Sequence, residues 1–488
     1  MLAQHQHIYK KLNHIVSDYP EHVAIIDGEK IILYAQLQQR INIIKGNITG
    51  YISSQEKVIV CMRRSFDFIA TIFALIDLGA IIVPLDPANP TKRMEYIIDI
   101  IKPCAILTDK TTSLLIPSLD AFRIFNVELC QENLKCEVHY EYCESDAIAI
   151  YFTSGSTGKP KGVLLSYMGY LNRLSWSQTG YPLTAEDVAI QQISIGFSIA
   201  FFEMLHPLLS GSTLVIVKNE LHRDMNLLID LINKYNVTFM HVVPSLLRKL
   251  LKTKRLTECR SLKQVSIGGE LFSPKLLSEL FDHLNCRFYH AYGSTELSAA
   301  VSHYELTRAD VGKSGVEIGS PITNVEFKLV KINSELQLSL VELHVSGVAL
   351  AIKYIDEVMH SEKFYHDAEN KIWFVTGDLF RLSKNGAIYF YGRIDNQVKI
   401  NGRRIELNEI QEVLNETNLV KEAKVLVKNN KLIACLCLEE AVRLQDIKEY
   451  IKERLPFYML PKEYITLKQF PTTLNGKVDT ISLLEMAE

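Results

Sequence analysis

Buried strands alternate with amphipathic helices in the pattern of hydrophobic and polar positions near the start of the chain. Short apolar runs recur at Lys57–Met62, Ile81–Asp86 and Cys104–Asp109. Between them, Phe66–Leu78 and Thr91–Ile101 place apolar residues at the spacing of one helix face. Strand, helix, strand, helix and strand in this order predict a parallel α/β layout.

The same alternation resumes further along the chain. The strands there are almost continuously apolar, which is typical of sheets covered by helices on both faces. The predicted strands are Ser212–Val217, Val237–Val243, Lys263–Glu270 and Cys286–Gly293, and the predicted helices lie near Asn226–Tyr235 and begin at Ser245 and Pro274.

The pattern changes in the last third. From about Val316 to Ile394 short strands and turns indicate a β-rich subdomain. Beyond Asp395, two amphipathic helices flank two strands, which is enough for a compact α+β domain. The predicted fold class is therefore α/β, with a large N-terminal domain of α/β subdomains and a β-rich subdomain, followed by a small α+β C-terminal domain.

Composition excludes several classes of protein. The 488 residues are 48% hydrophobic and 22% charged, with a net charge of -3, which is too little basic charge for a nucleic-acid partner. No apolar run reaches the roughly 18 to 20 residues of a membrane span, and no signal peptide is evident at the N-terminus. We therefore expect a cytoplasmic protein without a membrane partner. Its nine cysteines include no CxxC pair, which favours free thiols.

A glycine- and hydroxyl-rich loop follows the apolar strand in Ala147–Val163 (AIAIYFTSGSTGKPKGV). Glycines let backbone N–H groups approach an anion, while hydroxyls and lysines add donors and charge, so the loop suits a phosphate. It lacks the spacing of a Walker A loop. An ordinary polar turn with solvated lysines remains the alternative for this stretch alone. The candidate phosphate-binding residues are Thr153, Ser154, Gly155, Ser156, Thr157, Gly158 and Lys161.

Two further sites supply the other parts of a nucleotide site. The strand ending at Tyr292 is followed by Thr295 and Glu296, at the sheet edge where open α/β sheets bind ligands. Tyr292 suits a base, Thr295 a phosphate and Glu296 a magnesium ion. Asp378, after a strand and a glycine, suits ribose hydroxyls. Taken singly, a core tyrosine, a capping Thr-Glu pair and a turn aspartate would explain them equally.

Eight motifs in one order make the chain similar to the adenylate-forming superfamily. It most closely resembles the adenylation domains of nonribosomal peptide synthesis and stand-alone relatives such as D-alanine:carrier protein ligases. The motifs are Leu78–Arg93, Tyr151–Val163, Phe197–Gly211, Ala291–Glu296, Val375–Leu379, Gly392–Gln411, Leu455–Pro461 and Asn475–Asp479. The resemblance implies an N-terminal domain of residues 1–391 and a mobile C-terminal domain of residues 392–488, hinged at Asp395.

By this resemblance the enzyme uses ATP and Mg²⁺ in two half-reactions. A carboxylate attacks the α-phosphate to form an acyl-adenylate and pyrophosphate, and a thiol then displaces AMP. Lys477 matches the catalytic lysine of the first step, and the Tyr151–Val163 loop matches the β- and γ-phosphate loop. Thr295 matches the α-phosphate contact and Glu296 the metal ligand, while Asp378 and Arg393 match the ribose contacts. Rotation about Asp395 would exchange Lys477 for Lys399.

The acceptor follows from the sequence around the hinge. QVKINGRRIE resembles enzymes that charge carrier proteins more than those that charge free CoA, which remains the alternative. The chain ends at Glu488 with no carrier domain, so we expect a phosphopantetheinyl carrier protein to act in trans. A catalytically inactive nucleotide-binding homologue is a further, less favoured alternative.

The acid is the least determined part. Amino-acid-activating relatives place an aspartate, which pairs with the α-ammonium, where this chain has Ser198. Because a serine cannot neutralise a buried ammonium, an ordinary α-amino acid is disfavoured. An aryl, hydroxy or fatty acid, or an amino acid with its amine elsewhere, suits the remaining positions; for His241 a core role is the alternative. The positions matching the pocket are Phe197, Ser198, Ile199, Phe202, His241, Ser266, Gly268, Ala291, Ala299 and Ala300.

Overall fold

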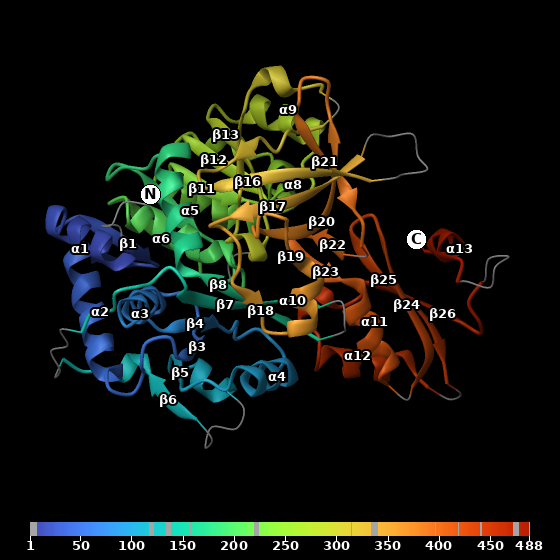
Figure 1. Cartoon of the computed structure of the whole chain (residues 1–488), viewed down its shortest axis with the longest axis horizontal. Helices are drawn as coiled ribbons and strands as arrows, with labels where there is room; N and C mark the ends of the chain where they lie inside the picture. Colours follow the sequence, from blue (N-terminus) through green and yellow to red (C-terminus); the bar gives the residue numbers. More distant parts are fainter. Residues whose placement is uncertain are drawn as a thin grey trace.

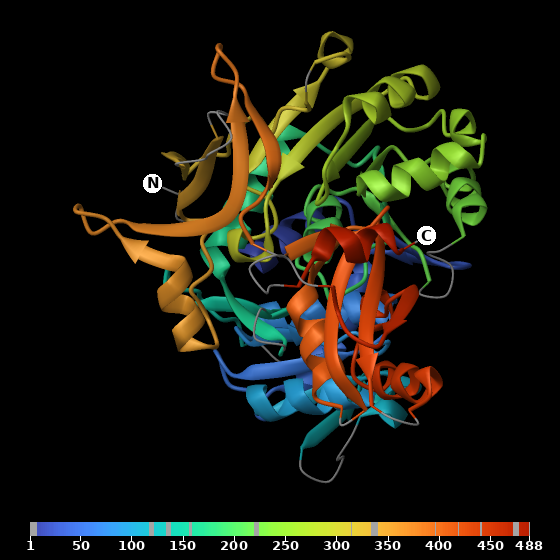
Figure 2. The same cartoon turned by 90° about the vertical axis from the view of Figure 1, so that its right-hand side faces the viewer.

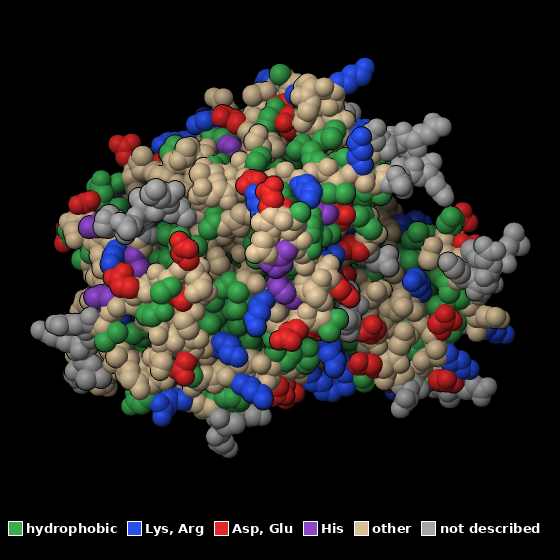
Figure 3. Space-filling model, viewed as in Figure 1, with side chains coloured by type: hydrophobic (Ala, Val, Ile, Leu, Met, Phe, Trp, Pro, Cys, Tyr) green, Lys and Arg blue, Asp and Glu red, His purple; other side chains and the backbone are tan. Residues whose placement is uncertain are grey.

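The structure is a computed structural model that describes most of the chain. The described residues are 7–116, 122–132, 138–155, 159–218, 224–313, 315–332, 340–395, 397–417, 419–439, 442–471 and 478–487. Among them, no helix is long and apolar enough to cross a membrane. Acidic and basic side chains are interspersed over the face seen in Figure 3, as the small net charge of -3 leads one to expect.

The larger of two main sheets has nine strands, and its inner strands run parallel. The strand after the predicted base-binding tyrosine turns back antiparallel, as does the hairpin at the opposite edge. In spatial order the strands are β15 (Ser320–Pro321), β14 (Ser302–Leu306), β13 (Arg287–Tyr292), β12 (Gln264–Gly268), β11 (Phe239–Val242), β9 (Val188–Gln191), β10 (Thr213–Ile216), β1 (Val23–Asp27) and β2 (Lys30–Leu33).

The second main sheet has seven strands and carries the predicted phosphate loop. The loop joins β7 to β8, which pair antiparallel, so the chain turns back at the loop instead of entering a helix. In spatial order the strands are β18 (Lys353–Tyr354), β8 (Lys161–Ser166), β7 (Ala147–Thr153), β4 (Ile81–Pro84), β3 (Lys57–Cys61), β5 (Ala105–Thr108) and β6 (Arg123–Asn126).

Helices pack between and around the two sheets (Figure 1). The largest hydrophobic cluster includes residues of both sheets together with α3, in which every residue from Phe68 to Asp77 is buried. Burial on all sides explains why α3 is apolar around its whole circumference. The helices of this part are α1 (Ile8–Asp18), α2 (Tyr34–Ile48), α3 (Phe66–Asp77), α4 (Thr91–Ile101), α5 (Tyr167–Gly180), α6 (Ile199–Leu208), α7 (Met225–Lys234), α8 (Pro244–Lys252) and α9 (Pro274–His283).

The predicted β-rich region forms a five-stranded sheet with one exception. Strand β18 leaves this region and pairs with β8, beside the phosphate loop. A two-residue strand is too short to give a hydrophobic pattern, so the sequence did not predict it. The sheet consists of β16 (Val325–Lys331), β17 (Leu340–Gly347), β20 (Ile372–Leu382), β19 (Phe364–His366) and β21 (Ile388–Arg393), and α10 (Glu357–Lys363) precedes β19.

The C-terminal part lies at one side of the main sheets (Figures 1 and 2). Its two hydrophobic clusters use, among described residues, only positions from Val398 onward. The two predicted helices and two predicted strands are present, together with further short elements. The elements are β22 (Gln397–Ile400), β23 (Arg403–Glu406), α11 (Leu407–Asn415), β24 (Val420–Lys428), β25 (Lys431–Leu438), α12 (Leu444–Lys452), β26 (Glu463–Leu467) and α13 (Thr480–Glu485). The predicted α/β fold class is confirmed.

Helix α5 is fixed by a side-chain cap directly after the strand that carries Lys161. The Ser166 hydroxyl accepts a hydrogen bond of 2.8 Å from the backbone N–H of Gly169. Replacing Ser166 by alanine is expected to lower the free energy of unfolding by about 1 kcal/mol, because a helix N–H loses its partner. Urea denaturation would measure the loss, and a Ser166→Thr variant, which keeps the hydroxyl, should recover most of it.

Candidate active site

One cavity of about 540 Å³ gathers most of the predicted site residues. It opens beside the carboxyl ends of β11, β12 and β13, which supply His241, Gly268 and Ala291. The end of the phosphate loop, strands β20 and β21 and the β22–β23 hairpin complete its walls. The position agrees with the rule that open α/β sheets bind ligands at their carboxyl edge.

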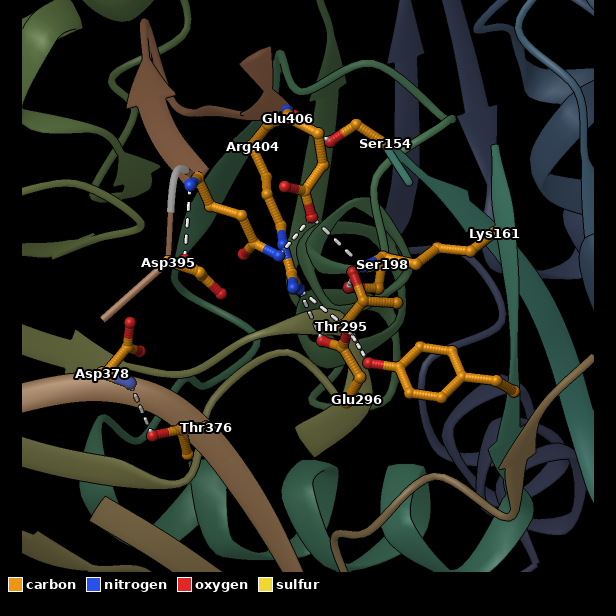
Figure 4. Close-up of polar contacts among 12 residues, drawn as sticks. Ser154, Lys161, Ser198, Thr295, Glu296, Thr376, Asp378, Asp395, Arg404 and Glu406 are labelled. Atoms are coloured by element: carbon orange, nitrogen blue, oxygen red, sulfur yellow. Dashed lines mark hydrogen bonds and ion pairs between the residues drawn. The ribbon is translucent and has the colours of Figure 1, made fainter. Parts of the chain in front are cut away.

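Tyr292, Asp378 and Arg393 form a buried cluster on one side of the cavity. The Tyr292 hydroxyl donates to Asp378 at 2.6 Å, and the Arg393 guanidinium is hydrogen-bonded to the other Asp378 oxygen. Burial and the neighbouring carboxylate raise the pKa of Tyr292 well above its usual value, so the tyrosine stays a donor. The Asp378 N–H donates to Thr376 Oγ1 at 3.0 Å, which fixes the strand (Figure 4). Asp378 is thus held in place at the cavity wall.

The predicted phosphate loop meets the C-terminal part directly. Gly155 N–H donates to Glu409 Oε2 at 3.0 Å, and the Ser154 hydroxyl donates to the Arg404 carbonyl at 3.0 Å. A Cβ on Gly155 would lie 1.9 Å from the Lys159 carbonyl oxygen, so only glycine fits there. Thr153 lines the cavity with a buried hydroxyl that has no partner among the described residues. The predictions for Ser156, Thr157 and Gly158 lie outside the described residues.

The two lysines after the loop differ. Lys159 is exposed, whereas Lys161, on β8, is buried and pairs with Glu406 at 3.3 Å. Burial lowers the pKa of Lys161, and the nearby Arg404 lowers it further, while Glu296 and Glu406 oppose the shift. A cation in this position requires an anionic partner. Lys161 is therefore no solvated surface lysine.

Glu296 is fully buried in the short helix η5 (Thr295–Leu297) and already has cationic and hydroxyl partners. Arg404 Nη1 lies 2.8 and 3.0 Å from its two oxygens, and the Tyr354 hydroxyl donates at 2.6 Å (Figure 4). Burial raises the pKa of Glu296, but Arg404 and Lys161 outweigh it and hold the pKa far below its usual range. The predicted metal ligand is therefore ionised and paired with arginine here.

Sequence reasoning missed the partners of these residues. Arg404, Glu406 and Glu409 lie in the quoted Gly392–Gln411 motif, and Arg93, which pairs with Glu409 at 2.6 Å, ends the Leu78–Arg93 motif. Their membership of a motif was the available signal, although no role was assigned to them. Tyr354 had no signal, because it lies in the unpredicted strand β18.

The residues predicted to exchange at the hinge are described in part. Asp395 accepts from Arg393 at 2.7 and 2.8 Å and follows β21. Lys399, on β22, lines the cavity and has no hydrogen-bond or ion-pair partner within the described part of the chain. Burial lowers the pKa of Lys399, and Asp378 opposes the shift. Lys477 lies outside the described residues.

The predicted acid pocket lies between α6 and the edge of the larger sheet. Ser198 precedes α6, is buried, and donates to Thr295 Oγ1 at 3.4 Å. Ala299 has a φ of 77°, unusual for a residue other than glycine, so the loop after Glu296 is strained where it meets the cavity. The predicted residues that line the cavity are Phe197, Ser198, Ile199, His241, Gly268, Ala291, Thr295, Ala299 and Ala300.

Two predicted pocket residues do not line the cavity. Phe202 is buried and stacks on His206 at 5.2 Å, with Tyr181 packed against its ring at 6.0 Å. Ser266 is buried in the middle of β12, and its hydroxyl has no partner among the described residues. Both predictions need correction because a sequence motif assigns a residue to an element but not a depth behind the surface.

The charge of the cavity wall is strongly positive. Its two carboxylates are already bonded, Asp378 to Tyr292 and Arg393, and Asp86 to the Ser194 hydroxyl and, at 2.9 Å, to the Ala88 N–H. No carboxylate on the described wall is therefore placed to receive a substrate ammonium. The charged residues lining the wall are the cationic Arg93, Lys249, Arg393, Lys399, Arg403, Arg404 and Lys462 and the anionic Asp86 and Asp378.

His241 should make stability depend on pH. Burial lowers its pKa to about 3, and Arg173 adds to the shift, so the folded protein keeps the imidazole neutral while the unfolded chain protonates near pH 6.5. Its contribution is present above pH 6.5 and is lost as the pH falls toward 3. Between pH 7 and 5.5 it should remove about 1 kcal/mol from the free energy of unfolding. Urea denaturation at both values should show a smaller loss for His241→Gln; equal losses would contradict the assignment.

Fold and site together define a nucleotide-binding enzyme with a mixed α/β architecture. The chain belongs to the AMP-binding enzyme family, whose model matches residues 12–354. The predicted resemblance to adenylate-forming enzymes is thereby confirmed.

Individual relatives agree with this assignment. The chain is 31% identical to zwittermicin A synthase ZmaJ of Bacillus cereus, over 94% of this chain and 91% of that protein. Other curated relatives are larger, and the chain spans 7% to 19% of their length.

Two solved structures show the same fold. An artificially fused adenylation-PCP di-domain from Klebsiella oxytoca has a TM-score of 0.84 at 23% identity, covering 100% of this chain and 97% of the other. The o-succinylbenzoate CoA synthetase of Bacillus subtilis also has a TM-score of 0.84, at 20% identity, covering 97% and 98%.

Proposed function

We propose that this enzyme uses ATP to adenylate a carboxylic acid and then transfers the acyl group to the phosphopantetheine thiol of a separate carrier protein. The carboxylate attacks the α-phosphorus, pyrophosphate leaves, and the thiol sulfur then attacks the acyl carbon while AMP leaves. Bringing a carboxylate to a phosphate opposes two negative charges, so the site must supply positive charge and aligned donors.

One observation carries this proposal. Asp378, Thr295 and Ser198 face one cavity, whose described wall is rich in cationic side chains. In the proposed complex Asp378 accepts the ribose hydroxyls, Arg393 supports Asp378, and Thr295 donates to the α-phosphate. The acid then lies beside Ser198, with its carboxylate next to Thr295. The 3.4 Å between the two hydroxyl oxygens supports this arrangement, because it places the two half-sites in contact.

Magnesium fits this site as a partner of the substrate. The described residues contain no group of three acidic, histidine or cysteine side chains that could hold a metal. Mg²⁺ typically binds one or two carboxylates together with phosphate oxygens and water, and Glu296 can supply that carboxylate when Arg404 moves away. The ion would supply positive charge to the phosphates, while Lys161 and the Gly155 N–H would bind their oxygens.

The two lysines divide the work between the half-reactions in this proposal. Lys477 would bridge the carboxylate and the phosphate during adenylation, and rotation of residues 392–488 about Asp395 would later bring Lys399 to the cavity. The unpaired Lys399 in the cavity wall supports this division, since the structure has the arrangement proposed for thioester formation. Separate hydrophobic clusters for the C-terminal part support its movement as one body.

The acceptor is proposed from two observations. The hinge sequence QVKINGRRIE favours a carrier protein, and the relative ZmaJ carries the name of a synthase. The CoA synthetase of the same fold keeps free CoA as the second candidate. Preformed acyl-adenylate offered to a holo-carrier protein and to CoA would separate them by the rates of thioester formation.

The acid is proposed to lack an α-ammonium. Ser198 is neutral, and both carboxylates of the described cavity wall have partners within the protein. Aryl, hydroxy and fatty acids suit such a pocket, as does an amino acid whose amine lies away from Ser198.

Pyrophosphate exchange tests the function. The full chain is given Mg-ATP, labelled pyrophosphate and a panel of α-amino, aryl, hydroxy and fatty acids, and exchange above background is expected with one class without an α-amine. Absence of exchange with every acid, together with no ATP binding in calorimetry, would instead support a non-catalytic homologue.

A further inference from the structure

Residues 397–409, here called the docked segment, satisfy three groups of the proposed triphosphate site. Arg404 pairs with Glu296, Glu406 with Lys161, and Glu409 accepts from the Gly155 N–H. Residues of the triphosphate site and of the docked segment in each pair are at least 108 positions apart in the sequence. Figure 4 shows Arg404 and Glu406 pointing together into the site from β23.

The signs of these charges match those of a metal triphosphate. A guanidinium lies on the carboxylate proposed to hold the metal. Carboxylates lie on the lysine and the N–H group proposed to hold phosphate oxygens. The docked segment therefore presents positive and negative groups to the same partners, with the same signs, as the ligand would.

Burial makes this substitution necessary. Lys161 and Glu406 have side chains that are 4% exposed, and the Glu296 side chain is fully buried. A buried ion left without a partner costs several kcal/mol, whereas a complete buried pair adds little net stability. The site therefore needs opposite charges at all times, and exchanging one set of partners for another costs little.

Geometry excludes both sets at once. Both Glu296 oxygens are bonded to Arg404, and one also accepts from Tyr354. Glu409 takes the Gly155 N–H with one oxygen and Arg93 with the other. The cavity beside Asp378 and Ser198 stays open, with a volume of about 540 Å³. The docked segment thus leaves room for an acyl-adenylate but none for pyrophosphate at these groups.

Resting on the proposed function, we infer that Glu406 and Glu409 are positioning residues of the thioester-forming step, which dock the segment by taking the place of the departed pyrophosphate. Inorganic pyrophosphate and docking then compete for Lys161 and Gly155. Pyrophosphate left in the site delays the approach of Lys399, so the second half-reaction begins only after the first product has gone.

The test uses the full chain with inorganic pyrophosphate and magnesium chloride, without ATP or acid. Calorimetry should show that Glu406→Gln and Glu409→Gln each bind pyrophosphate about tenfold more tightly than the wild-type chain, because an internal competitor is weakened. Glu412→Gln, an exposed residue one turn further along α11, is the matched control and should bind as the wild type does. Equal affinity in all four proteins would overturn the inference.

Two further measurements separate a positioning role from damage to the fold. Pyrophosphate should speed proteolysis of the wild-type chain near Asp395, because it displaces the docked segment; unchanged cleavage would contradict the inference without any variant. With preformed acyl-adenylate, both glutamine variants should form thioester about tenfold more slowly while keeping wild-type pyrophosphate exchange. Loss of exchange and thioester formation to the same extent in both variants would mean structural damage and would refute the positioning role.

Failure of the proposed function gives a different result. If the wild-type chain exchanges no pyrophosphate with any acid, the adenylation proposal fails, yet tighter pyrophosphate binding by the two variants would still support competition at Lys161 and Gly155. If exchange occurs and the affinities are equal, the competition fails and adenylation stands.

Discussion

Replacing Lys477 by alanine is expected to slow acyl-adenylate formation by about 10²–10³-fold, the scale of losing one preorganised charge stabiliser. The lysine is proposed to lie between the carboxylate and the α-phosphate, where no neutral side chain can offset the repulsion of two anions. Thioester formation from preformed adenylate should keep its wild-type rate, because Lys399 occupies the cavity in that step.

Pyrophosphate exchange measures the first step, and thiol release with synthetic adenylate measures the second. Lys468→Ala, an exposed lysine nine positions earlier, controls for a general loss of charge in this part of the chain. A Lys477→Ala variant that exchanges pyrophosphate at the wild-type rate would refute the assigned role.

Replacing Ser198 by aspartate is expected to change the class of acid that is accepted. The new carboxylate would lie at a buried position beside Thr295 and could pair with an α-ammonium. Buried charge pairs of this kind are worth about 2–5 kcal/mol when one partner is removed, so preference for an α-amino acid over its amine-free analogue should rise by at least about thirtyfold.

The ratio of kcat/KM for a matched pair of acids, with and without the α-amine, measures this change. Ser198→Asn is the matched control, because it has nearly the shape of aspartate without its charge. A similar rise in the asparagine variant would show that shape, not charge, sets the selectivity. An unchanged ratio in the aspartate variant would contradict the proposed position of the substrate's α-carbon.

The sequence predicts regular elements better than contacts. The helix predicted at Thr91–Ile101 is found with those bounds, because it has a clear 3.6-residue period and begins after a proline. Strand β18, with two residues, has no period to detect, yet it delivers Tyr354 to Glu296. Short elements whose position depends on distant partners cannot be predicted from local pattern.

The site shows the same limit. The motifs predict that Glu296 and Lys161 carry chemistry, but their partners Arg404 and Glu406 lie 108 and 245 positions away in the sequence. Only the fold reveals that opposite charges meet there. Likewise, the motif places Phe202 in the pocket, whereas α6 turns its ring toward His206 and Tyr181. Orientation on an element depends on packing that a single sequence does not specify.

The excess of arginine and lysine on the described cavity wall also affects encounters in solution. Carboxylates, nucleotides and phosphopantetheine are all anions, and a concave wall of one charge sign focuses the electric field toward its mouth. Such a field speeds the capture of all three ligands and weakens as salt shortens the Debye length, which is about 8 Å at physiological ionic strength. The wall that lacks a place for an ammonium therefore also draws in every anionic reactant of the proposed cycle.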